Sequence, residues 1–113
     1  MRTRRDLAHA RRLVIKIGTS VVSKANGDVD ARWACQFAAQ IRTLHDAGHQ
    51  VIVVSSGAIG AGRHLLQLAS RPKSLIEKQA AAAVGQPRLM RVFKDAFRKA
   101  GLPVAQVLLT YDD

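Results

Sequence analysis

Aromatic residues, cysteine and long apolar runs are all scarce in this 113-residue sequence. Phe, Trp and Tyr together make up 4% of the residues. The single cysteine, Cys35, excludes an internal disulfide and is typical of a protein from a reducing cytoplasm. No apolar run approaches the roughly 20 residues that span a bilayer. We therefore expect a cytoplasmic protein that does not interact with a membrane.

The remaining composition predicts one globular α/β domain. Apolar residues make up 48% of the chain and the mean hydropathy is −0.02, values typical of a folded globular protein. Because aromatics are few, Val, Ile, Leu and Ala must build most of that core. Aliphatic runs of this kind are typical of parallel strands covered by helices. We expect a basic, solvated lead-in at residues 1–12 and the N-terminal part of one domain at residues 13–113.

The formal net charge of +10 raises the hypothesis of nucleic-acid binding. The basic residues are spread mainly over residues 1–12 and residues 88–99, and they are not interleaved with aromatic side chains that would stack on bases. We therefore expect no nucleic-acid partner.

Strand and helix patterns alternate along the chain. We expect strands at residues 13–17, 51–54 and 104–109. A helix capped by Asp30 should cover residues 31–47 and end at Gly48. Helical character follows the second strand to about residue 68, returns at residues 74–84, and restarts at Pro87. This order predicts an α/β fold: a three-layer αβα sandwich with a mainly parallel sheet, here incomplete.

The first candidate site residue is Lys16, because it interrupts the aliphatic strand LVIKI. A buried, unpaired ammonium is costly, and Lys16 lies near the carboxyl end of its strand, where α/β sheets bind ligands. The alternative is an edge-strand lysine that reaches water. Gly18, Thr19 and Ser20 follow directly, and their backbone N–H groups and hydroxyls could approach a phosphate.

A second loop, Ser55-Ser56-Gly57, follows the second strand and precedes a helix. The N-terminus of a helix offers free N–H groups that favour a carboxylate or a phosphate. Two neighbouring strand-to-helix loops could face one crevice and bring a carboxylate and a nucleoside triphosphate together.

Several sharper motifs are missing. GAIGAG at residues 57–62 reverses the glycine spacing of dinucleotide sites, and neither a P-loop nor Gly-x-Ser-x-Gly occurs. His45 and His49 have zinc-like spacing, but Gly48 should break the helix between them, so we expect surface residues and no metal ligands. Cys35 should be a small core residue.

Four ordered motifs resemble the glutamate 5-kinase branch of the amino-acid kinase superfamily. They are VIKIGTSVV at residues 14–22, VVSSGAIGAGR at 53–63, KQAAAAVGQPRLM at 78–90 and QVLLT at 106–110. The resemblance implies an amino-acid kinase-like fold and transfer of the ATP γ-phosphoryl group to the side-chain carboxylate of L-glutamate. The product, γ-glutamyl phosphate, would be the first intermediate of proline biosynthesis.

The same resemblance implies roles for individual residues. Lys16 would be catalytic and contact the ATP phosphates, and Gly18, Thr19 and Ser20 would line the phosphate site. The glutamate would be held by Ser56, Gly57 and Ala58. Mg²⁺ would accompany ATP, and the complete enzyme would be a homo-oligomer.

In this family, further glutamate-binding and nucleotide-binding residues follow the part that the four motifs cover. We therefore expect the 113-residue chain alone to lack kinase activity. The alternative hypothesis is a non-catalytic glutamate-binding or partner-dependent module with the same fold.

Overall fold

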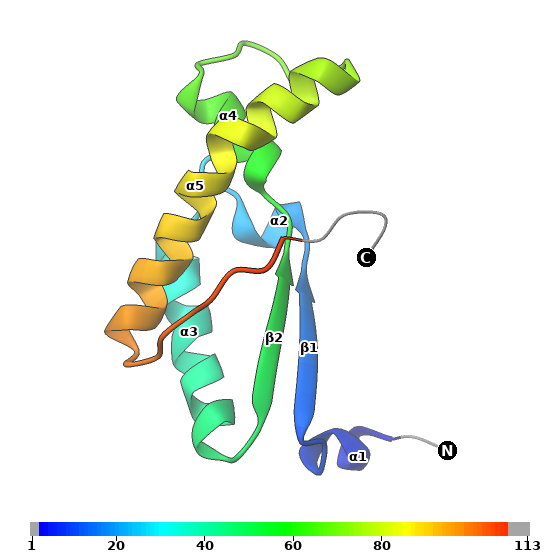
Figure 1. Cartoon of the computed structure of the whole chain (residues 1–113), viewed down its shortest axis with the longest axis vertical. Helices are drawn as coiled ribbons and strands as arrows, with labels where there is room; N and C mark the ends of the chain where they lie inside the picture. Colours follow the sequence, from blue (N-terminus) through cyan, green and yellow to red (C-terminus); the bar gives the residue numbers. More distant parts are fainter. Residues whose placement is uncertain (1–2, 109–113) are drawn as a thin grey trace.

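The computed structural model describes residues 3–108. Figure 1 shows the order of the elements along the chain. They are α1 (Arg4–Ala8), β1 (Arg12–Ile17), α2 (Thr19–Val22), α3 (Ala31–Asp46), β2 (Gln50–Ser55), α4 (Ala58–Leu65) and α5 (Leu75–Lys99). None of the described helices is both long and apolar enough to cross a bilayer.

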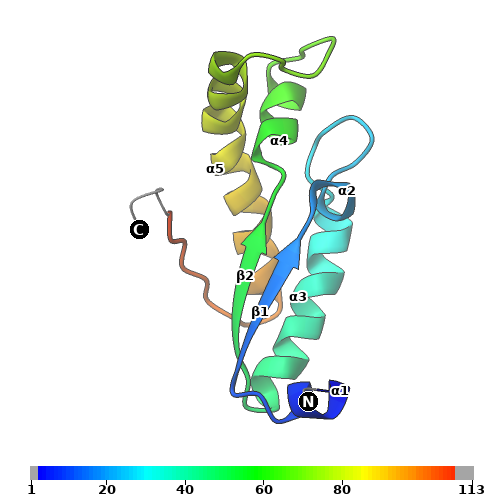
Figure 2. The same cartoon turned by 90° about the vertical axis from the view of Figure 1, so that its right-hand side faces the viewer.

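The two strands form a parallel pair that runs from Arg12 opposite Gln50 to Ile17 opposite Ser55. Side chains alternate between the two faces of the sheet. On the inner face, Ile17 is buried against the helices. The outer face exposes a set of aliphatic side chains: Val14, Ile52 and Val54. In Figure 2 this outer face points toward the viewer, and α3 and α5 lie behind it. The α/β prediction is confirmed, and the described residues form the sheet and one helical layer.

The few aromatic side chains are concentrated between α3 and α5. Phe37 meets Phe93 and Phe97 edge-on, with ring centroids 6.5 Å and 6.2 Å apart, and Trp33 stacks on Phe37 at 5.0 Å. Offset and edge-to-face pairs are the favoured arrangements of aromatic rings. The apolar faces predicted for these two helices therefore meet each other and fill the inner side of the sheet.

Local signals fix both ends of α3 as predicted. The Asp30 carboxylate accepts a hydrogen bond from the Trp33 N–H at 3.0 Å, which satisfies one of the free donors of the first turn. After the helix, Gly48 takes a positive φ of 97°, a conformation that other residues adopt only with strain. His45 is exposed as expected, whereas His49 is half-buried and its Nδ1 lies 2.5 Å from the Ala10 carbonyl oxygen.

Two glycines allow α4 and α5 to pack backbone against backbone. A Cβ placed on Gly62 would overlap the carbonyl oxygen of Ala81, and a Cβ on Gly85 would overlap the carbonyl oxygen of Ala58. Gly60 is also close to another segment, because its Cβ would lie 3.0 Å from the Gly27 carbonyl oxygen. The glycines of GAIGAG therefore serve close packing of the helices and of the loop after β1.

The break predicted at Pro87 is wrong, because α5 continues from residue 75 to residue 99. Proline removes one backbone donor from a helix, which normally destabilises its interior. Here Gly85 packs on α4 and Leu89 is buried in the core, so tertiary contacts hold the helix on both sides of the proline. The loop predicted after β1 also contains the one-turn helix α2, and the lead-in contains α1, whose residues are all exposed.

The third strand is also not formed in the described part of its predicted range. Residues 104–108 have no strand partner, and residue 109 lies outside the described residues. Leu102 and Val104 pack against the core, whereas Val107 and Leu108 are exposed. An aliphatic sequence becomes a strand only where a neighbouring strand takes its backbone hydrogen bonds, and the segment has none here.

The close contact between α4 and α5 predicts an unusual effect of Gly62→Ala. Helix propensity alone would make this change stabilising by about 1 kcal/mol. Because the new methyl group must displace the α5 backbone, we expect a loss of roughly 2 kcal/mol or more in unfolding free energy.

Urea denaturation followed by circular dichroism measures this loss. Gly18→Ala is the matched control, since Gly18 has a negative φ and its Cβ would meet nothing within 4 Å. Equal stability of the Gly62→Ala variant and the unchanged protein would contradict the packing.

Candidate functional site at the carboxyl edge of the sheet

Parallel pairing brings both predicted loops to one edge of the sheet. Ile17 and Ser55 are the last residues of their strands and lie opposite each other. The next residue of the second loop adds a cross-link, because the Ser56 N–H donates to the Ile17 carbonyl at 3.0 Å. The loops after β1 and β2 are therefore neighbours, as the sequence predicts.

Lys16 lies on the outer face of the sheet, one residue before the end of β1. It is exposed and pairs in register with Val54. Its neighbours on this face are the exposed side chains of Val14 and Ile52. In the described residues the ammonium group of Lys16 is therefore open to water.

The residues after Lys16 turn directly into a helix. Gly18 is the N-cap of α2, and Thr19 and Ser20 form its first turn, where backbone N–H groups lack acceptors within the helix. All three residues are exposed. This turn therefore offers N–H groups and two hydroxyls beside the end of β1, a donor set that suits a phosphate.

The second loop leads into α4 through a glycine with positive φ. Gly57 is the N-cap of α4 with φ of 117°, and its Cβ would lie 2.9 Å from Val22 Cγ1. A side chain at this position would therefore meet both backbone strain and the end of α2. Ser56 is exposed, Ala58 is half-buried, and no side chain caps the first turn of α4. The backbone donors of that turn stay free for an anion.

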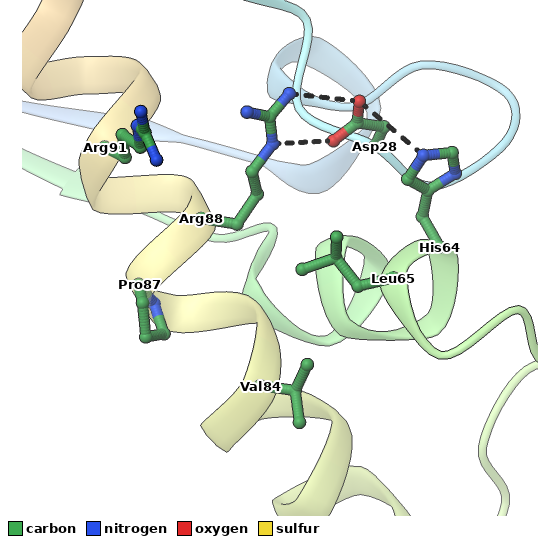
Figure 3. Close-up of a pocket in the computed structure, with 7 residues that line it drawn as sticks. All are labelled: Asp28, His64, Leu65, Val84, Pro87, Arg88 and Arg91. Carbon is green, nitrogen blue, oxygen red and sulfur yellow. Dashed lines mark hydrogen bonds and ion pairs between the residues drawn. The ribbon is translucent and has the colours of Figure 1, made fainter.

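Sequence reasoning missed a charged cluster of three residues, Asp28, Arg88 and His64, beside these loops. Arg88 makes a two-point contact with Asp28, with Nε–Oδ1 and Nη2–Oδ2 distances of 3.3 Å (Figure 3). His64 Nε2 lies 3.8 Å from Asp28 Oδ2. These residues come from the loop after β1, from α5 and from α4, and they line one open pocket. No local motif could reveal a pair that is 60 residues apart in sequence.

The Asp28 carboxylate is mostly buried, with its side chain 13% exposed. Burial by itself raises the pKa of a carboxylate. Hydrogen bonds from Arg88 and from the Val29 N–H, together with the charges of Arg88 and His64, outweigh burial and hold the pKa of Asp28 below its ordinary value. Asp28 therefore stays ionised and keeps its contact with Arg88 at neutral pH.

Comparison with known proteins shows which family the chain belongs to. A family model described as "Amino acid kinase family" matches residues 11–113. The chain belongs to the amino acid kinase family.

Relatives within this family are about 50% identical to the chain over the aligned residues. A glutamate 5-kinase from Citrifermentans bemidjiense is 51% identical over 107 residues, which cover 95% of this chain and 29% of that protein. One from Thermus thermophilus is 47% identical over 92% of this chain and 28% of its own length. One from Listeria innocua is 47% identical over 96% of this chain and 40% of its own length. The chain thus spans less than half the length of these glutamate 5-kinases.

The donor set at the carboxyl edge fits a nucleotide phosphate better than a metal ion. An ammonium group, backbone N–H groups and hydroxyls gather there from Lys16, Gly18, Thr19 and Ser20. None of the residues predicted for this site carries a carboxylate, the ligand that Mg²⁺ prefers in proteins. Within residues 3–108 no group of three His, Cys, Asp or Glu side chains is placed to hold a metal. We therefore assign no step to Mg²⁺ at this edge of the sheet.

The lowered pKa of Asp28 predicts how Asp28→Asn affects stability at different pH. A carboxylate with a lowered folded-state pKa contributes stability above the ordinary pKa, near 3.9, and loses it as pH falls through the lower, folded value. We expect the variant to be less stable by about 1 kcal/mol at pH 7 and the difference to shrink below about pH 4.

Denaturant unfolding of both proteins from pH 7 to pH 3 measures this difference. Asp46→Asn is a suitable control, because Asp46 forms an exposed pair with Arg42 at the end of α3. A stability difference between wild type and Asp28→Asn that stays constant down to pH 3 would contradict the assignment.

Proposed function

We propose that this chain is the N-terminal part of a glutamate 5-kinase, which transfers the γ-phosphoryl group of ATP to the side-chain carboxylate of L-glutamate. The observation that carries the proposal is the meeting of two donor-rich loops, after β1 and after β2, at one edge of a parallel sheet. About 50% identity to proteins named glutamate 5-kinase over nearly the whole chain supports the choice of substrate. The product would enter proline biosynthesis.

Each loop has a distinct role in this proposal. Lys16 neutralises charge on the transferring phosphoryl group, and Gly18, Thr19 and Ser20 bind the ATP phosphates through N–H groups and hydroxyls. Ser56 and the backbone of Gly57 and Ala58 bind glutamate, since the uncapped first turn of α4 presents free donors.

The chemistry needs alignment more than it needs a base. A carboxylate is already a nucleophile, so no proton must be removed before it attacks the γ-phosphorus. Catalysis then consists of holding the two substrates in line and stabilising charge on the phosphoryl oxygens. The hydrogen bond from Ser56 N–H to Ile17 fixes the separation of the two loops and thereby supports this alignment.

We further propose that the complete enzyme works as a cytoplasmic homo-oligomer that uses Mg²⁺ with ATP. The single half-buried Cys35 is compatible with a reducing compartment. Oligomerisation and the use of Mg²⁺ follow from the resemblance to the family.

Lys16→Ala in a full-length protein that carries this sequence tests the catalytic assignment. Loss of a charge that stabilises the transition state should lower kcat about 100-fold or more. Trapping γ-glutamyl phosphate with hydroxylamine measures the rate.

Arg12→Ala is the matched control, because Arg12 lies exposed on the same strand at its opposite end, about 13 Å away. It should keep a rate within about twofold of wild type. Near-normal turnover of the Lys16→Ala protein would remove Lys16 from the mechanism.

The isolated 113-residue chain should form no γ-glutamyl phosphate from glutamate and ATP. In the described residues the outer face of the sheet leaves Lys16 in water, where a charge stabilises a phosphoryl group only weakly. The same hydroxylamine assay on the purified chain measures this, with a full-length protein as the positive control. Turnover by the isolated chain would show that no further segment is needed.

A further inference from the structure

The loop between α2 and α3 is a closed unit that begins at the candidate phosphate site. Val22, the last residue of α2, is completely buried, and its carbonyl accepts a hydrogen bond from Asp30 N–H at 2.8 Å. One residue further toward the tip of the loop, Ser23 and Val29 form an antiparallel bridge. The loop tip is closed by the Lys24 N–H, which donates to the Asp28 carbonyl at 2.8 Å. Displacement of Asp28 would therefore be transmitted to α2.

Asp28 attaches this closed loop to α5 and to α4, and the first turn of α4 belongs to the other half of the site. Its carboxylate receives the two-point contact from Arg88 on α5 and faces His64 on α4. Asp28 is the sole acidic residue among those that line the described pocket. Since Gly57 caps the start of α4, the cluster links the loop after α2 to the helix that follows the glutamate loop.

We propose that Asp28 and Arg88 are positioning residues that hold the Gly18–Ser20 turn in register with the Ser56–Gly57 turn for phosphoryl transfer. This inference rests on the proposed function. Neither residue touches a substrate in this assignment. They act because an error of about 1 Å between two reacting groups can lower a rate by about two orders of magnitude.

The geometry of the cluster favours positioning over a general contribution to folding. Arg88 holds both carboxylate oxygens, which fixes the direction as well as the distance of the contact. Arg91, on the next turn of α5, lines the same pocket without an ion pair to Asp28 (Figure 3). It carries the same charge on the same helix and is therefore a natural control.

The test uses full-length protein with Asp28→Asn, Arg88→Gln, the double variant and Arg91→Gln. With rates normalised to the folded fraction, we expect kcat to fall at least about tenfold in both single variants, while KM for glutamate and for ATP changes less than about threefold. The double variant should be no worse than the poorer single variant, because the two residues act as a pair. Arg91→Gln should stay within about twofold of wild type.

Amide hydrogen exchange provides a readout that does not need turnover. Asp28→Asn should speed exchange of the hydrogen-bonded amides of residues 21–23 more than tenfold and leave α3 unchanged, since α3 is held by its own aromatic packing.

The outcomes separate the two proposals. If wild-type protein phosphorylates no glutamate, the proposed function fails, and hydrogen exchange still decides whether the cluster fixes the loop. If wild type is active, rates within twofold of it for both single variants overturn the positioning role. Losses that multiply in the double variant, or that follow the folded fraction, overturn it too.

Discussion

The arrangement of the candidate site depends on the backbone contact between α4 and α5. Gly62 and Gly85 remove the side chains that would otherwise keep the two helices apart. The aromatic residues of α5 fix that helix on α3. Because α4 packs on α5, the position of α4 and of its N-cap Gly57 is fixed as well. Burial of Val22 against Gly57 then carries this constraint across to α2. The packing of α4 on α5 thus sets the geometry of both loops.

The parallel pairing of β1 and β2 is the second constraint, and it fixes the edge of the sheet at which both loops lie. Parallel strands place their carboxyl ends at one edge, so strand pairing alone makes neighbours of two loops that are about 38 residues apart in sequence. The hydrogen bond from Ser56 N–H to the Ile17 carbonyl extends the backbone pairing one residue beyond β2. In the proposed function, the spacing of the two paired strands therefore sets the distance between the phosphate-binding donors and the glutamate-binding donors.

The features that the sequence predicts well are those with local causes. The two strands, the Asp30 cap and the turn at Gly48 follow from residues within a few positions of each other. The predictions that failed depend on distant partners. Pro87 stays within a helix because α4 and the core hold both flanks. Residues 104–108 form no strand because no neighbour within residues 3–108 accepts their hydrogen bonds. Asp28 and Arg88 could not be paired from sequence, since nothing local links residues 60 positions apart.

The exposure of Lys16 to water decides how strongly its charge can act on a substrate. A unit charge 4 Å from another is worth about 1 kcal/mol in bulk water and about 4 kcal/mol at the effective dielectric near a protein surface. In the described residues Lys16 is exposed, so its charge acts far more weakly than it would in a site closed to water. Yet its neighbours Val14, Ile52 and Val54 are aliphatic, and such a surface favours burial. If that face is covered, the effective dielectric around Lys16 falls, and its ammonium group interacts more strongly with a phosphoryl group without any change in its own position. The catalytic value proposed for Lys16 therefore depends on exclusion of water from the outer face of the sheet.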